Sequence, residues 1–346
     1  MKKIGLIMKL VVVVALAAIG VAGVFGGKFP KCLKVVTNVL KGDTTIFEGE
    51  TVPLSDEASE VNSYIHDVTI LGEVHSNAET ELYFNDRTIE DLNQFIIDLG
   101  QFFQLEKCEM CNTNLTNEQM DALGQIYPDT KFVWIVHCAQ WSIRTDAVSF
   151  STMFVDYGWG PETSEDFEPL KYCTDLEALD IGHKSCTDIS FLKDLKKLKI
   201  LIIAINRITD ITPLEGLTNL TYLELFLNDI QDLSPLEKLV NLEYLNLCHN
   251  RNIGDIDPIL HYTNLKRLWI SNCNLTTDEI NLIKATYPNT WLEFNVYESV
   301  QAGWRDGTVY YPMRNAFNNG VIDPMFYPKV YVEEETDTSQ SETSSE

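Results

Sequence analysis

The chain has 346 residues, of which 45% are hydrophobic and 22% are charged, and its formal net charge is −25. This length allows either one large core or an elongated array of repeats. The acidic balance argues against nucleic acid as a partner, and against an anionic membrane surface as a partner of the folded part, because both need a basic face.

The first 27 residues have the character of a targeting segment. Lys2 and Lys3 come first, and an uncharged run of 18 residues follows from Leu10 to Gly27. A helix of that length would measure roughly 27 Å, close to the thickness of a bilayer core. Small residues near the end of the run would also suit a signal peptidase. The sequence therefore predicts a signal peptide or a retained membrane anchor, with the anchor slightly favoured, and export of the rest of the chain.

Residues 28–76 show no pattern that we can assign, and a tether is the simplest interpretation. A repeat-like pattern begins at residue 77, with a strand around Leu82 and an amphipathic helix over residues 90–101. We expect residues 77–138 to form an N-terminal helical repeat or cap block.

A second, less obvious duplication joins two distant parts of the chain. The segment from Asn114 to Val136 matches that from Asn274 to Val296 at a constant offset of 160 residues. In the first copy, Thr116 and Gln119 have the spacing of a capping box, in which the threonine accepts from a backbone amide and the glutamine reaches back. The same strand–helix–strand unit is expected to end two repeat blocks, because terminal units usually cover the open core.

Residues 139–169 connect the two blocks. This segment has too many aromatic residues for a free linker, namely Trp141, Phe150, Phe154, Tyr157 and Trp159. We expect this connector to pack against the repeats.

Residues 170–274 contain an internal repeat of about 22 residues. Its units start at leucines separated by 22, 22, 22 and 23 positions: Leu176, Leu198, Leu220, Leu242 and Leu265. Apolar residues recur three and five positions after each start, and three units have an asparagine eight positions on, at Asn206, Asn228 and Asn250. Each unit is expected to be a short strand, an asparagine turn and a tight return, and only stacked units can bury their leucines.

A proline closes three of the units, at Pro213, Pro235 and Pro258. This pattern resembles bacterial leucine-rich repeat proteins of the internalin-like class, whose units have the same asparagine turn and proline corner. The layout also resembles exported leucine-rich repeat proteins of anaerobic Gram-positive bacteria, through segments such as Arg144-Thr-Asp-Ala and Gly303-Trp-Arg. The resemblance implies an α/β leucine-rich repeat solenoid. Such a solenoid has a curved parallel sheet on its concave side, helices and short turns on its convex side, and helical capping units. It implies that the inner sheet binds a protein or, less often, a glycan.

The strand residues between the leucines are expected to face outward on the inner sheet, because successive strand residues point to opposite sides. They would form columns of one contiguous exposed patch: Ile200, Ile202, Tyr222, Glu224, Phe226, Tyr244, Asn246, Arg267 and Trp269. Aromatic residues and arginine are enriched at interface hot spots, so this patch is the predicted ligand-binding face. In the alternative interpretation, the connector or the C-terminal segment folds over the sheet and buries it.

Residues 275–332 are rich in aromatic side chains and predict an ordered C-terminal cap. Residues 333–346 are acidic, rich in Ser and Thr and free of bulky apolar residues, so we expect a disordered tail.

No constellation of residues predicts catalysis, a metal site or a cofactor. Cys108 and Cys111 form a C-x-x-C, but on a strand this spacing places one sulfur inward and the other outward. His183 and His249 are three units apart, too far to share a metal ion, and are expected at the surface. The sequence therefore predicts a non-catalytic extracellular protein-binding module. The alternatives are an envelope structural or assembly module with a self-covered sheet, and a glycan-binding accessory protein.

Overall fold

The computed structural model describes residues 65–152 and 162–296, together with residues 303, 304, 315 and 317. The chain divides into two compact units, Met1–Ile135 and Val136–Glu346. The expected targeting segment and acidic tail lie outside the described residues. Among the helices of these described ranges, none has the length and apolar composition of a membrane-spanning segment.

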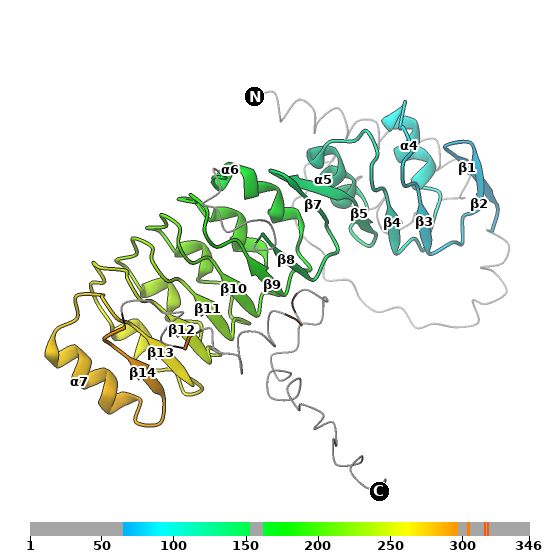
Figure 1. The fold of residues 1–346 in the computed structure, drawn as a ribbon. Helices are drawn as coiled ribbons and strands as arrows, with labels where there is room; N and C mark the ends of the chain where they lie inside the picture. Colours follow the sequence, from blue (N-terminus) through cyan, green and yellow to red (C-terminus); the bar gives the residue numbers. More distant parts are fainter. Residues whose placement is uncertain (1–64, 153–161, 297–302, 305–314, 316, 318–346) are drawn as a thin grey trace, which may run out of the picture. The chain divides into compact units, whose positions relative to one another are not determined.

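The first unit contains a hairpin, a small parallel sheet and two helices (Figure 1). Its elements are β1 (Asp67–Ile70), β2 (Glu73–Ser76), β3 (Glu81–Tyr83), α4 (Leu92–Leu99), β4 (Lys107–Glu109), α5 (Asn117–Ile126) and β5 (Lys131–Val133). Strands β1 and β2 are antiparallel, whereas β3, β4 and β5 pair in parallel in that order. The two residues of the hairpin turn, Leu71 and Gly72, both have positive φ angles, 50° and 81°, as a tight hairpin turn requires.

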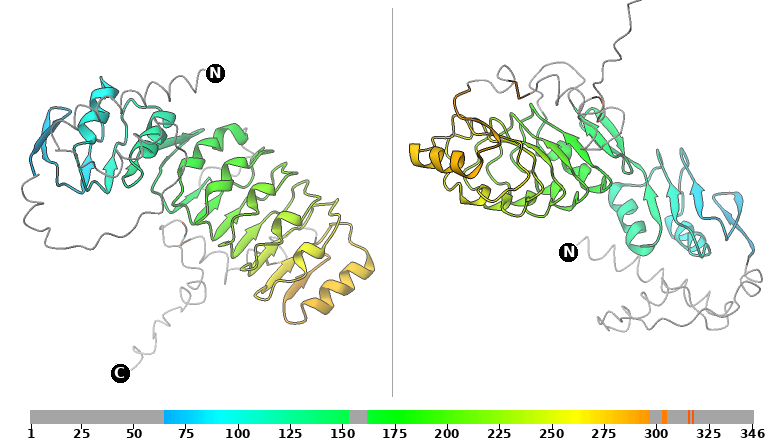
Figure 2. Two further views of the ribbon diagram at one scale, coloured as in Figure 1. Left: turned by 180° about the vertical axis from the view of Figure 1, so that it is seen from behind. Right: turned by 90° about the horizontal axis from the view of Figure 1, so that it is seen from below.

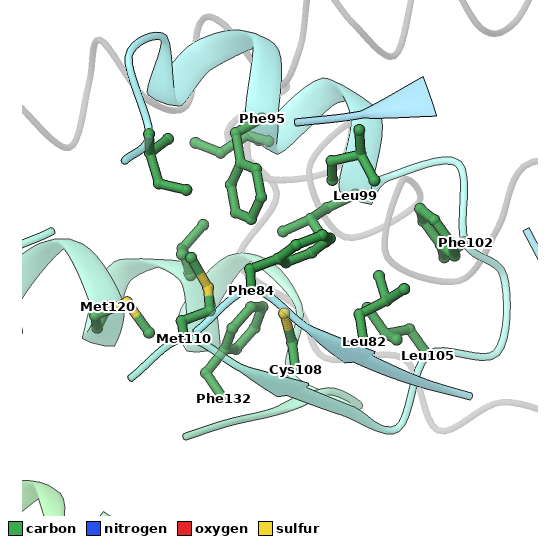
Figure 3. Packing of buried hydrophobic residues seen from close by; sticks show 14 of the residues in the cluster. Leu82, Phe84, Phe95, Leu99, Phe102, Leu105, Cys108, Met110, Met120 and Phe132 are labelled. Carbon is green, nitrogen blue, oxygen red and sulfur yellow. The ribbon is translucent and has the colours of Figure 1, made fainter. Parts of the chain in front are cut away.

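The core of this unit lies between the parallel strands and the helices, as Figure 3 shows. Phe84 and Phe95 meet edge to face, with ring centroids 5.6 Å apart. Helix α4 is shorter than the sequence predicts. It begins after Asp91, whose carboxylate accepts hydrogen bonds from the amides of the next turn, and Gly100 ends it.

The predicted duplication is visible in matching helix ends. Helices α5 and α7 (Thr277–Thr286) begin with capping boxes at Thr116 and Thr276. Both end at a tyrosine, Tyr127 or Tyr287, whose hydroxyl donates to a main-chain carbonyl of the preceding repeat. The capping box predicted from the sequence is confirmed in the first copy, and the same local chemistry ends both repeat blocks.

The second unit is built on a parallel sheet whose strands follow one another in chain order (Figures 1 and 2). The strands are β8 (Ser149–Ser151), β9 (Ala178–Asp180), β10 (Ile200–Ile202), β11 (Tyr222–Glu224), β12 (Tyr244–Asn246), β13 (Arg267–Trp269) and β14 (Trp291–Glu293). The convex side carries the 3₁₀ helices η3 (Ser190–Asp194), η4 (Thr212–Leu214), η5 (Ser234–Leu236) and η6 (Asp257–Ile259). The middle leucine of each strand from β9 to β13 is in register with its neighbours and fully buried. This is the α/β leucine-rich repeat solenoid that the sequence predicts.

The repeated asparagines bond to the backbone of their own repeat and of the preceding one. Asn228 accepts a hydrogen bond from the amide of Ile208 at 3.1 Å and donates to the carbonyls of Ile203 and Leu225 at 3.1 and 3.0 Å. Asn206 and Asn250 make the equivalent bonds. These side chains satisfy backbone groups that the turns leave unpaired inside the solenoid, as predicted.

The residue just before each asparagine position adopts a left-handed backbone conformation. The φ angles at this position are 59°, 57°, 52°, 65° and 57° for His183, Ile205, Leu227, His249 and Asn272. Asparagine tolerates this conformation well, but it costs a β-branched or bulky residue about 1–2 kcal/mol. The stacking of the repeats therefore imposes a backbone geometry that several of these side chains do not favour.

The described part of the connector packs on the first repeat. It contains β7 (Trp141–Arg144), β8 and α6 (Ser164–Phe167), and β8 pairs in parallel with β9. Strand β6 (Ile135–Cys138) precedes it, and η2 (Glu168–Tyr172) begins at its end. The ring of Trp141 stacks on Phe167 at 6.1 Å, and the ammonium of Lys184 lies 4.7 Å from the centre of the Trp141 ring. Lys184 also pairs with Glu162 at 3.3 Å. The other connector aromatics, Phe154, Tyr157 and Trp159, lie outside the described residues.

Candidate ligand-binding face

The candidate site is the inner side of the sheet, called the concave face here. It is defined by the first and third residues of strands β9 to β13 and by the residue two positions beyond each strand. On each strand the middle leucine points into the solenoid core, so its two neighbours point to the opposite side. The nine residues predicted from the sequence are therefore brought together on one surface, in the columns that the strand register gives.

The expectation that this surface is exposed is wrong for seven of the nine residues. Phe226 and Tyr244 are partly accessible, and the other seven are buried: Ile200, Ile202, Tyr222, Glu224, Asn246, Arg267 and Trp269. The physical reason is a cluster in which two side chains from beyond the repeats, Trp304 and Phe317, pack on the concave face. The structure thus favours the alternative in which the chain covers its own sheet.

Trp304 occupies the centre of the concave face. It is 1% exposed, and its ring lies 5.6 Å from that of Tyr222 and 5.4 Å from that of Trp269, tilted against both. Its indole nitrogen donates to a carboxylate oxygen of Glu224 at 3.1 Å. The same carboxylate oxygen accepts from the hydroxyl of Tyr222 at 3.3 Å. The face therefore holds the indole by ring contacts on two sides and by a charge-assisted hydrogen bond.

Two further contacts hold main-chain atoms of the same segment. Arg267 donates from Nη1 to the carbonyl of Gly303 at 3.4 Å, and its guanidinium lies 4.3 Å from the centre of the Trp291 ring. The hydroxyl of Ser149, on β8, donates to the carbonyl of Phe317 at 2.6 Å. Main-chain oxygens of Gly303 and Phe317 thus contact the sheet at β13 and at β8.

Two buried donors on the concave face reach no acceptor in the described part of the chain. They are Nδ2 of Asn246 and Nε1 of Trp269. The two residues are register partners on β12 and β13, and both are 0% exposed. The oxygen of the Asn246 side chain accepts from the amide of Cys248 at 3.0 Å, which leaves its nitrogen unpaired. Buried donors without partners are costly, so an added acceptor at either group would stabilise the occupied face.

Three other residues that the sequence singled out are buried: Cys108, Cys111 and His249. Cys111, expected to point outward, is buried like Cys108, because the chain turns after β4. His249, expected at the surface, is 8% exposed and packs edge to face against Phe226 at 5.2 Å. Within the described ranges no three His, Cys, Asp or Glu side chains are grouped so that they could hold a metal ion.

The sequence analysis missed Gly303, Trp304 and Phe317 as residues of the site. They follow the last repeat and belong to no periodic pattern, so repeat alignment cannot place them on a particular strand. The available signal was their aromatic character in a segment otherwise expected to be a cap.

The fold and the asparagine turns define a leucine-rich repeat array. The family described as "Leucine Rich repeats (2 copies)" matches residues 196–238, 218–261 and 240–284. No curated protein matches the chain.

Among solved structures, the chain is similar to two internalins of Listeria monocytogenes str. 4b F2365. Internalin C2 is 26% identical with a TM-score of 0.29, over 55% of this chain and 70% of that chain. The internalin inlF is 16% identical with a TM-score of 0.33, over 66% of this chain and 87% of that chain. The leucine-rich repeat ectodomain of the receptor kinase SOBIR1 from Arabidopsis thaliana is 20% identical with a TM-score of 0.31, over 48% and 82%.

Proposed function

We propose that the protein is a non-catalytic, protein-binding leucine-rich repeat module whose concave face is the recognition surface. The observation that carries this proposal is the seating of Trp304 against Tyr222, Glu224 and Trp269. A surface that takes up an aromatic side chain of one polypeptide segment has the shape and hydrogen-bonding groups to take up another. The two unpaired donors, on Asn246 and Trp269, supply polar groups that a ligand could engage.

The proposed location is outside the cell, with membrane contact only through the N-terminal segment. This part of the proposal rests on the uncharged run from Leu10 to Gly27 and on the acidic balance of the remainder. Protease added to intact cells should degrade the chain, while a cytoplasmic marker protein in the same cells stays intact. Protection of the chain until the cells are lysed would contradict the proposed location.

Binding through the concave face can be tested by site-specific photo-crosslinking in cells. Phe226 is half-buried at the accessible edge of the face, and a photoreactive phenylalanine analogue at this position should crosslink to the partner. Val240 is 48% exposed and lies in the turn before β12, so the same analogue there serves as the matched control. We expect a discrete crosslinked product from position 226 alone. Equal products from both positions, or a product from Val240 alone, would place the binding surface elsewhere.

The second candidate function is a structural module whose concave face is permanently occupied by its own chain. The burial of Trp304 and Phe317 favours it. A Trp304→Ala variant separates the two functions. If the face binds a partner, removing the indole should increase crosslinking from position 226. If the occupation is purely structural, the variant should lose stability without gaining any crosslinked product.

A further inference from the structure

We infer that the ligand of the concave face is a peptide segment containing Gly-Trp, and that Gly303 and Trp304 occupy the site as an intramolecular stand-in for it. This inference rests on the proposed protein-binding function and specifies the chemistry of the partner. It follows from three features of the occupied face: the indole contacts, the backbone conformation of the glycine, and the donors that Gly303 and Trp304 leave unpaired.

The first feature selects an indole over other aromatic groups. Tyr222 and Trp269 offer ring surfaces that any aromatic side chain could use, with centroids 5.6 and 5.4 Å from Trp304. The carboxylate of Glu224 accepts a hydrogen bond from the indole N–H at 3.1 Å and is itself 1% exposed. A phenylalanine has no donor for this buried carboxylate and would leave an acceptor without that bond. The site therefore discriminates by the N–H group.

The second feature selects glycine before the tryptophan. Gly303 has a φ angle of +96°, a conformation that L side chains rarely adopt. A Cβ built on Gly303 would come no nearer than 3.7 Å to another atom, the Cη2 of Trp291, so space alone does not demand glycine. The backbone conformation is what favours glycine here. It directs the carbonyl of Gly303 to the guanidinium of Arg267 at 3.4 Å while the next side chain enters the site.

The third feature indicates that a partner can fit better than the chain's own segment. Asn246 and Trp269 present buried donors that no atom of the described chain accepts. A ligand with a carbonyl, side-chain amide or carboxylate oxygen beside its Gly-Trp pair can satisfy them. Such a ligand gains hydrogen bonds that Gly303 and Trp304 do not make.

This gain is needed because the ligand competes with a tethered group. A tethered group competes at an effective concentration on the order of millimolar. Only molecules whose concave face is open can bind an outside ligand, so the apparent affinity is the intrinsic affinity multiplied by that open fraction. A free peptide that merely copies the chain's own sequence should therefore bind weakly to the wild type. It should bind much more tightly once Trp304 is removed.

The test uses the full chain and a fluorescein-labelled peptide copying Gln301 to Asp306, acetyl-Gln-Ala-Gly-Trp-Arg-Asp-amide, with binding followed by fluorescence anisotropy. Trp304→Ala protein should bind it at least about tenfold more tightly than the wild type. Replacing the peptide's tryptophan with 1-methyltryptophan, which lacks the N–H donor, should weaken binding by about tenfold or more. Replacing its glycine with L-alanine should weaken binding by about tenfold, whereas D-alanine, which favours positive φ, should preserve it.

Three results would overturn the inference. The first is absence of binding by folded Trp304→Ala protein. The second is binding that is equal for the tryptophan and 1-methyltryptophan peptides, or for the L-alanine and D-alanine peptides. The third is binding by the variant with no detectable binding by the wild type at millimolar peptide, because the face would then serve only its own chain.

A second variant keeps the test decisive if Trp304→Ala does not fold. Trp304→Phe retains a ring on the concave face and loses only the donor to Glu224, so it should fold and bind the peptide with intermediate affinity. Failure of these peptide experiments would reject the Gly-Trp ligand alone. The protein-binding function would still be decided separately, by crosslinking from position 226.

Discussion

The indole nitrogen of Trp304 lies 3.1 Å from a carboxylate oxygen of Glu224, a residue 80 positions earlier in the chain. This contact joins the segment after the last repeat to the third residue of β11, at the middle of the concave face. It turns a surface that the repeat pattern predicts to be open into one that is occupied.

Replacing Trp304 with alanine should lower the free energy of unfolding by about 3–5 kcal/mol, because it removes a large, fully buried side chain. Trp291 is the matched control, since it is 44% exposed and also contacts Trp269. Trp291→Ala should cost only about 1 kcal/mol. Chemical denaturation of both variants measures the difference, and equal losses would show that Trp304 is not buried on the face.

Replacing Asn228 with alanine should lower the free energy of unfolding by about 2–4 kcal/mol, because buried backbone groups of two repeats lose their partners. Asn219 is an exposed asparagine that donates a single hydrogen bond, to the carbonyl of Lys196 at 2.8 Å. Asn219→Ala should cost no more than about 1 kcal/mol. Thermal and denaturant unfolding measure both losses of stability. Equal losses for the two variants would show that the hydrogen bonds of Asn228 do not stabilise the stacked repeats.

Replacing Leu227 with asparagine should raise the free energy of unfolding by about 0.5 kcal/mol, although it removes an apolar side chain. Leu227 has a φ angle of 52° and is half-buried, and asparagine already occupies the equivalent position at Asn272. The relief of left-handed backbone strain outweighs the lost contacts. The control is Leu225→Asn in the same turn, which places a polar group in the core and should cost several kcal/mol. A clear destabilisation by Leu227→Asn would show that the strain is not relieved.

The protein should lose stability in alkaline solution through its buried thiols. Burial raises the pKa of the Cys186 and Cys273 thiols to about 12, well above the ordinary range of a cysteine thiol. The unfolded chain releases these protons first, so the stabilising contribution is complete below about pH 9 and is lost as the pH rises toward 12.

Cys186→Ala tests this dependence. The free energy of unfolding of this variant should fall less steeply than that of the wild type between about pH 9 and 12, by up to about 1.4 kcal/mol per pH unit. Below about pH 8 the difference between the two proteins should be constant. Parallel curves across the alkaline range would show that Cys186 does not titrate on unfolding.

The repeat architecture could be predicted from the sequence because its determinants are local and periodic. Each determinant acts within one repeat unit or between neighbouring units. The determinants are the regularly spaced leucines, the asparagine at each turn and the capping box before a helix. Their positions in the structure follow directly. Helix α4 is shorter at both ends than the hydrophobic pattern predicts. Asp91 caps its start and Gly100 ends it, and the hydrophobic pattern does not register either effect.

The state of the concave face could not be predicted in the same way. The sequence places Tyr222, Glu224 and Trp269 on one surface, but what covers that surface depends on a contact with Trp304 that no repeat specifies. An exposed aromatic sheet and a self-covered one have the same repeat sequence. Only the tertiary position of the segment beyond the repeats distinguishes them.

The central claim is that the indole of Trp304 occupies the concave face and can be displaced from it. Hydrogen exchange of the Trp304 indole N–H, assigned in NMR spectra by its loss in Trp304→Ala, tests this most directly. The account predicts slow exchange in the free protein, faster exchange in Glu224→Gln, and exchange at the rate of a free indole when the Gly-Trp peptide saturates the face. Exchange at the free rate in the unliganded protein would contradict occupation, and unchanged protection at saturating peptide would contradict displacement.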